Sequence, residues 1–199
     1  MRLVITGGPC VGKTTLINLL QDNGYKVVQE VATEIIKEGR ILPWVDRMQF
    51  QMEVLRMQLE TERGLAQYPK DIFLDRGVFD GEAYFNVDGM AVPPIFNSID
   101  PKRYELAFLV EPLSFFETTT VRRESLEFTL EITDRLEAAY ARRGIEVVRV
   151  PFASPEERLN FVLKRLKAVK KVHKPTAQTQ VPVRKISIYQ ASVPLNVVS

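Results

Sequence analysis

The chain has 199 residues, of which 45% are hydrophobic and 26% charged, and these values predict one globular α/β domain with an appendage. The net charge of +2 hides an asymmetry, because residues 1–157 carry 18 basic and 25 acidic residues whereas residues 158–199 carry nine basic and no acidic ones. One cysteine excludes an intramolecular disulfide, and one histidine in the basic tail puts a zinc cluster or a Cys–His nucleophile pair out of reach. We expect a cytoplasmic protein, since no apolar run reaches membrane-spanning length and the first residues read as a strand rather than a signal peptide.

The first predicted elements are a strand over residues 2–6 and a helix over 13–22, joined by a glycine-rich turn. The turn reads Gly7-Gly8-Pro9-Cys10-Val11-Gly12-Lys13-Thr14 and fits the phosphate-loop pattern G-x-x-x-x-G-K-[ST]. The backbone N–H groups of such a turn and the start of the following helix bind phosphate. We therefore expect residues 7–15, including Thr15, to bind a nucleotide, with Lys13 on its β- and γ-phosphates and the Thr14 hydroxyl on Mg²⁺. A plain glycine turn is the minor alternative, and Cys10 is interpreted as a structural filler.

A strand over 25–29, a short helix over 32–37 and a long helix over 44–63 follow. The long helix is expected to bury Val45, Met48, Met52, Leu55 and Leu59, which recur at helical spacing. Glu30 directly follows the second strand, at the sheet edge that carries the phosphate loop. We predict that Glu30 accepts the proton of an attacking hydroxyl; a solvated glutamate at a loop start is the alternative.

The third predicted strand, residues 71–75, runs into Asp75 and Arg76. An apolar strand that ends in aspartate after a phosphate loop is the Walker B arrangement, whose carboxylate orders Mg²⁺. We expect Asp75 near the metal and Arg76 facing the phosphates or the substrate, the alternative being a capping aspartate beside a surface arginine. Four aromatic residues either stack on a planar base or, more commonly, pack in the core: Trp44, Phe50, Tyr84 and Phe85.

The fourth predicted strand, residues 106–110, is followed by a polar stretch and a helix over 124–142. Arg122 and Arg123 lie in this stretch, where a mobile lid could bring them onto the γ-phosphate. A charged helix start is the alternative, although arginine opposes the helix dipole there.

A strand over 145–150 and a helix over 155–170 complete the pattern. Strands separated by helices predict a three-layer α/β fold, a five-stranded parallel sheet flanked by helices as in kinase-like P-loop proteins, with ligands at the carboxyl ends of the strands. We assign residues 1–170 to this domain and residues 171–199 to a basic tail, which is either a disordered tail or an arm with a short strand near 186–189. Its charge suggests an anionic partner, unless the segment packs on its own acidic domain or is solvated.

Segments 5–16, 27–36, 73–84, 122–127 and 150–158 resemble the small AAA-type predicted ATPases. That family is similar to the ribosylnicotinamide kinase domain and, more distantly, to deoxynucleoside and thymidylate kinases, and the resemblance covers about residues 1–165. It implies Lys13 and Thr14 on phosphates and Mg²⁺, Asp75 near the metal, Glu30 as base, Arg122 and Arg123 as lid arginines, and the loop 151–154 near adenine. The basic tail departs from a minimal kinase.

Two functions follow from these residues. The first is an Mg²⁺-dependent kinase that transfers a phosphoryl group from ATP (or GTP) to a small metabolite or nucleoside. ATP is favoured because the guanine signature of GTPases is absent. The alternative is a nucleotide-dependent switch or slow NTPase that acts through a protein, lipid or nucleic-acid partner. The oligomeric state is not predicted.

Overall fold

The computed structural model describes residues 1–112 and 126–173. Within them, five parallel strands form one sheet in the order β2-β3-β1-β4-β5. The strands are β1 (Arg2–Thr6), β2 (Lys26–Val28), β3 (Ile72–Asp75), β4 (Leu106–Val110) and β5 (Val147–Val150). The predicted α/β fold with a five-stranded parallel sheet is therefore confirmed, and β1 lies at its centre, between β3 and β4.

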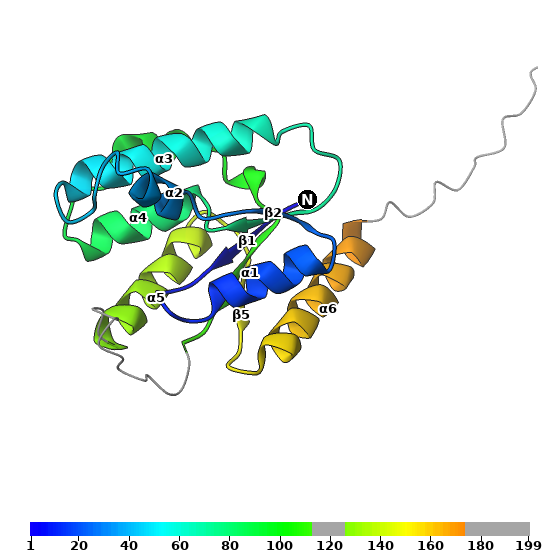
Figure 1. Ribbon diagram of the computed structural model, residues 1–199. Helices are drawn as coiled ribbons and strands as arrows, with labels where there is room; N and C mark the ends of the chain where they lie inside the picture. Colours follow the sequence, from blue (N-terminus) through cyan, green and yellow to red (C-terminus); the bar gives the residue numbers. More distant parts are fainter. Residues whose placement is uncertain (113–125, 174–199) are drawn as a thin grey trace, which may run out of the picture.

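Helices cover both faces of the sheet (Figure 1). The helices are α1 (Lys13–Asp22), α2 (Val31–Lys37), α3 (Arg47–Gly64), α4 (Val78–Val87), α5 (Leu126–Ala141) and α6 (Pro155–His173), with short 3-10 helices at Pro94–Ser98 and Pro101–Arg103. α1 and α6 pack on one face, whereas α3, α4 and α5 contribute to the clusters on the other. No helix in the described ranges is long and apolar enough to span a lipid bilayer.

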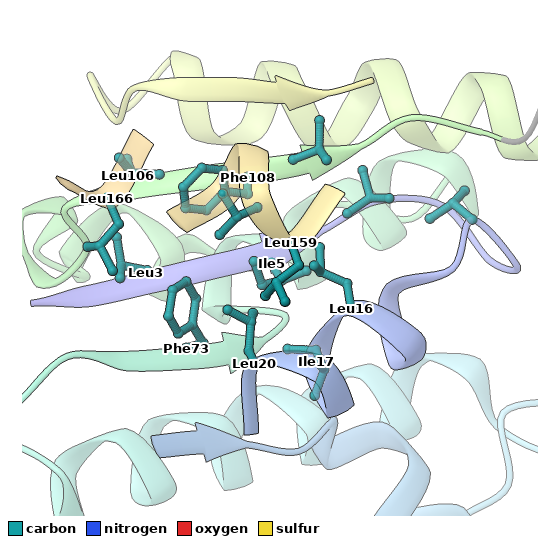
Figure 2. Packing of buried hydrophobic residues seen from close by; sticks show 14 of the residues in the cluster. Leu3, Ile5, Leu16, Ile17, Leu20, Phe73, Leu106, Phe108, Leu159 and Leu166 are labelled. Carbon is teal, nitrogen blue, oxygen red and sulfur yellow. The ribbon is translucent and has the colours of Figure 1, made fainter. Parts of the chain in front are cut away.

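Alternate residues of the strands enter opposite cores. Leu3 and Ile5 of β1 pack with Phe73, Leu16 and Leu166 between the sheet and the pair α1 and α6 (Figure 2). Val4, between them in sequence, joins the cluster on the other face. Because both faces are covered, β1, β3 and β4 read as continuous apolar runs in the sequence, and this is the signal that made them predictable.

The long helix α3 differs from its prediction at the start and in its buried face. It begins at Arg47 rather than residue 44, because the Asp46 side chain caps it by accepting a hydrogen bond from the backbone N–H of Gln49. The first three of the five residues of the predicted apolar stripe are exposed: Val45 by 76%, Met48 by 42% and Met52 by 39%. Leu55 is buried as expected, but its buried helix neighbours include Phe50, Gln51, Gln58 and Glu62.

Helix α4 was not predicted. Its residues are buried almost all round, so the sequence between 78 and 87 lacks the polar stripe that reveals a surface helix. The other differences are at boundaries: the strands predicted at 25–29, 71–75 and 145–150 are shorter, the helix predicted at 124–142 ends at Ala141, and α6 continues to His173 instead of ending near 170. These differences of a few residues at the ends leave the order of the predicted strands and helices along the chain unchanged.

Candidate functional site

The turn between β1 and α1 is held in conformations that suit glycine. Gly7 has φ +146° and Gly12 has φ +92°, both in the region that side chains rarely adopt. A Cβ at Gly7 would also lie 2.7 Å from the backbone oxygen of Val110. Cys10 takes φ +59° and its side chain is exposed, so the prediction that it fills the structure is wrong. The turn thus has the geometry of a backbone nest for anions.

Lys13 folds back onto this turn. Its Nζ donates a hydrogen bond to the backbone oxygen of Gly8 at 2.6 Å, and the side chain is buried. Burial lowers the pKa of Lys13 to about 8, because it removes water from the charged ammonium. Thr14 and Thr15 are exposed at the start of α1. An ammonium placed beside a nest and an exposed hydroxyl one residue later are groups that could contact phosphate and a metal ion.

Asp75 ends β3 directly beside Ile5 of β1. Its side chain is buried, and among the described residues its Oδ1 has no hydrogen-bond partner. Burial raises the pKa of Asp75 to about 6. A buried carboxylate oxygen with no protein partner fits a site for Mg²⁺, which is usually held by one or two protein oxygens together with phosphates and water. The described residues contain no group of three or more His, Cys, Asp or Glu side chains that could hold a metal alone.

Arg76 connects the phosphate loop to α2 and α4. Its φ is +68°, an unusual value for arginine, and its carbonyl oxygen accepts a hydrogen bond from Nε2 of Gln58 at 3.3 Å. Nη1 donates to the backbone oxygen of Gly7 and to Oδ1 of Asp80, both at 3.1 Å. The guanidinium also lies 5.3 Å from the ring centroid of Tyr84. Strained backbone that the surroundings hold in place is common at functional sites.

Glu30 lies at the N-cap of α2, not at the end of a strand, because β2 ends at Val28. Its Oε1 accepts a hydrogen bond from Nε of Arg76 at 2.5 Å, and its Oε2 accepts one from Oγ1 of Thr33 at 2.8 Å. Burial alone would favour the neutral acid, but the charge and hydrogen bond of Arg76 outweigh it and lower the pKa of Glu30 to about 2. The structure therefore brings Lys13, Glu30, Asp75 and Arg76 together at one edge of the sheet.

These side chains line a cavity of about 370 Å³ between the phosphate loop and helices α2, α3 and α4. Other lining residues are Ile36, Arg47, Phe50, Gln51, Gln58, Asp80 and Tyr84. Of the four aromatic residues that either stack on a base or pack in the core, Phe50 and Tyr84 line this cavity, whereas Phe85 is fully buried against Phe96 and Trp44 is 72% exposed outside it.

Gln51 was missed by the sequence analysis. It is 5% exposed, it lines the cavity, and it has no side-chain hydrogen bond to another described residue. An amide that lines a cavity and forms no hydrogen bond with a neighbouring described side chain can donate to and accept from a bound molecule, so Gln51 is a candidate contact for a ligand. Glutamine on a helix gives no sequence signal of this kind.

Arg158 was also missed as a site residue. Its guanidinium donates to the backbone oxygens of Val11 at 2.6 Å, Pro151 at 3.1 Å and Glu111 at 3.1 Å. One buried side chain from α6 thus joins the phosphate loop to the ends of β4 and β5. The loop 151–154 is placed beside the phosphate loop by these contacts. Arg122 and Arg123, predicted as lid residues, lie outside the described residues.

A model of the AAA domain family matches residues 2–158, which include the phosphate loop, Glu30, Asp75, Arg76 and Arg158. No curated protein sequence matches the chain. Among solved structures, deoxyadenosine kinase from M. mycoides is 13% identical with a TM-score of 0.59, over 84% of this chain and all of that one. Thymidylate kinase from Ehrlichia chaffeensis is 13% identical with a TM-score of 0.59, over 83% and 98% of the two chains.

The NadR protein in complex with NR is 16% identical with a TM-score of 0.63; the match covers 96% of this chain but only 52% of the NadR chain. At these identities the likeness shows a shared fold, that of small-molecule and nucleotide kinases. The phosphate loop within that fold implies nucleotide binding.

Proposed function

Since the chain belongs to the AAA domain family, we propose that it is an Mg²⁺-dependent kinase that transfers the γ-phosphoryl group of ATP to a small metabolite or nucleoside. Its structural neighbours by fold include kinases of deoxynucleosides, thymidylate and shikimate. GTP is the other nucleotide that the phosphate loop could take. This function accounts for the cavity, which a protein that only hydrolyses nucleotide does not need.

The cavity of about 370 Å³ beside the phosphate loop carries this proposal. Its volume lies within the range for small-molecule sites, about 300–1,000 Å³, and its lining mixes apolar walls with a few converging polar groups. Lys13 and Glu30 both line it, so an acceptor bound there would meet the nucleotide at the end of the phosphate loop. Gln51 and Arg47 supply polar contacts further along the wall.

Each residue of the candidate site has a proposed role in phosphoryl transfer. Lys13 and the backbone of residues 7–15 hold the phosphates, and Thr14 and Asp75 hold Mg²⁺, which neutralises charge on the transferred group when it is bound. Arg76 orients Glu30 and contributes positive charge near Gly7. Arg122 and Arg123 are proposed to close over the γ-phosphate.

Glu30 is proposed to orient the acceptor hydroxyl and to take its proton late in the transfer. A carboxylate with a pKa of about 2 is a weak base, but phosphoryl transfer has a loose transition state that needs little early deprotonation. The same low pKa favours the second candidate function, a slow NTPase or nucleotide switch, because such a protein needs no strong base.

A screen of nucleosides and small hydroxyl-bearing metabolites for acceptor-dependent ADP formation with Mg-ATP distinguishes the two functions. The kinase predicts strong stimulation by one class of acceptor and a phosphorylated product. Slow hydrolysis that no acceptor stimulates would favour the switch. Glu34→Gln, an exposed carboxylate on the same helix as Thr33, is a control variant that should leave the rate unchanged.

A further inference from the structure

A second cavity, of about 340 Å³, lies at the opposite edge of the sheet from the phosphate loop. Its walls come from the amino-terminal ends of β1 and β3, the 3-10 helix Pro101–Arg103 and the segment that follows α3. We propose that this cavity binds a small molecule that carries phosphate groups. The inference is independent of the proposed kinase activity, because no residue of the cavity belongs to the candidate site.

The lining of the cavity is positively charged. Four cationic side chains, Arg2, Lys70, Lys102 and Arg103, line it together with one carboxylate, that of Glu105. Glu62 lies behind the two arginines and is fully buried. Two carboxylates against four cations leave an excess of positive charge, which favours an anion.

The two arginines are fixed in place before any ligand arrives. Nε of Arg103 donates to Oε2 of Glu62 at 2.9 Å, and Nη2 of Arg2 donates to the backbone oxygen of Glu62 at 3.0 Å. The Arg103 guanidinium also lies 5.7 Å from the ring centroid of Tyr104. Both side chains keep part of their surface exposed, 19% for Arg2 and 17% for Arg103. A guanidinium held at one edge still has N–H donors on its other edge, and their fixed fork suits phosphate oxygens.

The two lysines at the rim differ from the arginines. Lys70 and Lys102 are exposed, and neither forms an ion pair with another described residue. A flexible ammonium without a carboxylate partner can move onto a bound anion without breaking an existing pair. Two fixed forks on the wall and two mobile charges at the rim are the elements of a phosphate site.

The size of the cavity fits a small molecule, since ligand sites start at about 300 Å³. Tyr68, which is 40% exposed, lines it and offers an apolar ring face beside the charges. We therefore expect a phosphate ester with a compact organic part rather than a bare anion. Inorganic pyrophosphate is a suitable first probe because it presents only the phosphate chemistry.

Calorimetric titration of the full chain with pyrophosphate tests the site. The Lys13→Ala variant serves as the background, because it weakens binding at the phosphate loop. In this background we expect one remaining site, and Lys70→Ala combined with Lys102→Ala should weaken it about tenfold or more. The matched control is Lys164→Ala with Lys167→Ala, which removes two exposed lysines of α6 outside the cavity.

The proposal is overturned if the Lys13→Ala protein binds no pyrophosphate, or if the two double variants lose affinity equally. Arg103→Lys gives a further test, because it keeps the charge but removes the fork; unchanged affinity in this variant would also overturn the assigned geometry. A thermal melt of each variant shows that it is folded. Failure of the kinase proposal gives a different result: no acceptor stimulates ADP formation from Mg-ATP, whatever happens at the second cavity.

Discussion

Nε of Arg76 lies 2.5 Å from Oε1 of Glu30, although the two residues are 46 positions apart in the sequence. Arg76 follows β3, and Glu30 lies at the N-cap of α2, two residues after the end of β2. The ion pair therefore joins the segments that follow two adjacent strands of the sheet. Glu30 is thereby charged over nearly the whole accessible pH range. The positive charge of Arg76 compensates the carboxylate of Glu30, so a charged carboxylate can lie beside the phosphate loop.

Glu30→Gln should lower acceptor-dependent turnover about 100-fold and change nucleotide affinity by less than about twofold, because its proposed work is on the acceptor. Steady-state kinetics and calorimetry with Mg-ATP measure the two effects. Glu34→Gln is the control. Equal turnover in Glu30→Gln and the control would remove Glu30 from the site.

The low pKa of Glu30 also predicts how stability depends on pH. The pairing with Arg76 stabilises the fold above pH 4.5 and is lost as the pH falls toward 2, so the free energy of unfolding of Glu30→Gln should fall less over that interval than that of the unaltered chain.

Lys13→Ala should reduce Mg-ATP affinity at least 100-fold, and the affinity of the unaltered chain should depend on pH. The pKa of Lys13 is lowered to about 8, so above pH 8 the free protein holds a neutral amine and must take up a proton to bind phosphate. Affinity should then fall by up to about tenfold per pH unit above pH 8, and this dependence should be missing in the variant. Titrations at several pH values measure it. A flat profile for the unaltered chain would contradict the role of this ammonium.

Asp75→Asn should abolish Mg²⁺-dependent turnover and yet stabilise the protein. The pKa of Asp75 is raised to about 6, so its carboxyl group favours folding below pH 4, and that contribution is lost as the pH rises through 6. At pH 7.5 the amide should raise the free energy of unfolding by about 2–3 kcal/mol, the value of the pKa difference. Urea unfolding at pH 7.5 and pH 4 tests this; a variant less stable than the parent at pH 7.5 would refute it.

Glu62→Gln should destabilise the fold by about 2–4 kcal/mol, because it leaves two arginines without their carboxylate and disturbs a buried network. Glu62 accepts hydrogen bonds from Tyr104 at 2.5 Å and from Gln58 at 3.0 Å as well as from Arg103. The control is Glu60→Gln on the same helix, whose side chain is 55% exposed and should matter by less than about 0.5 kcal/mol. Chemical unfolding of both variants measures the two free energies of unfolding. A similar loss of stability in both would show that the network contributes little.

Truncation after His173 should preserve nucleotide affinity, since α6 is described as far as His173 and every described residue of the candidate site precedes that position. The removed segment carries Lys174, Arg184 and Lys185 and no acidic residue. Binding to an anionic polymer such as heparin should weaken on truncation, and the difference should shrink with added salt because the Debye length is only about 10 Å at 0.1 M. Loss of Mg-ATP binding would instead make the segment part of the nucleotide site.

The central strands β1, β3 and β4 were predictable because they are buried on both faces, and the phosphate loop was predictable from its specific residue spacing. Lys13 and Asp75 could be placed together from these facts alone, since the carboxyl ends of parallel strands share one edge. The part of the site that α3 contributes could not be predicted from the sequence. Gln51 and Gln58 belong to the buried face of α3, and nothing in the sequence distinguishes them from solvated glutamines until α4 is known to pack against that helix.

The role of Arg158 could not be predicted from the sequence either. It lies in a helix rich in lysine and arginine, where a charge usually points to water, yet it is buried beneath the phosphate loop. The three carbonyl oxygens that accept its hydrogen bonds come from three separate loops. These oxygens come together because of the order of the strands in the sheet, and the hydrophobic periodicity of the sequence does not reveal that order.

Cys10 gives the protein a built-in chemical reporter. It is the one cysteine of the 199 residues, its thiol is exposed, and it stands in the wall of the cavity beside Lys13. A maleimide dye would label the chain at a single position without any engineered residue. A bound triphosphate should shield the thiol, so the rate of alkylation would measure occupancy directly, and a mercury compound at the same sulfur would serve for crystallographic phasing.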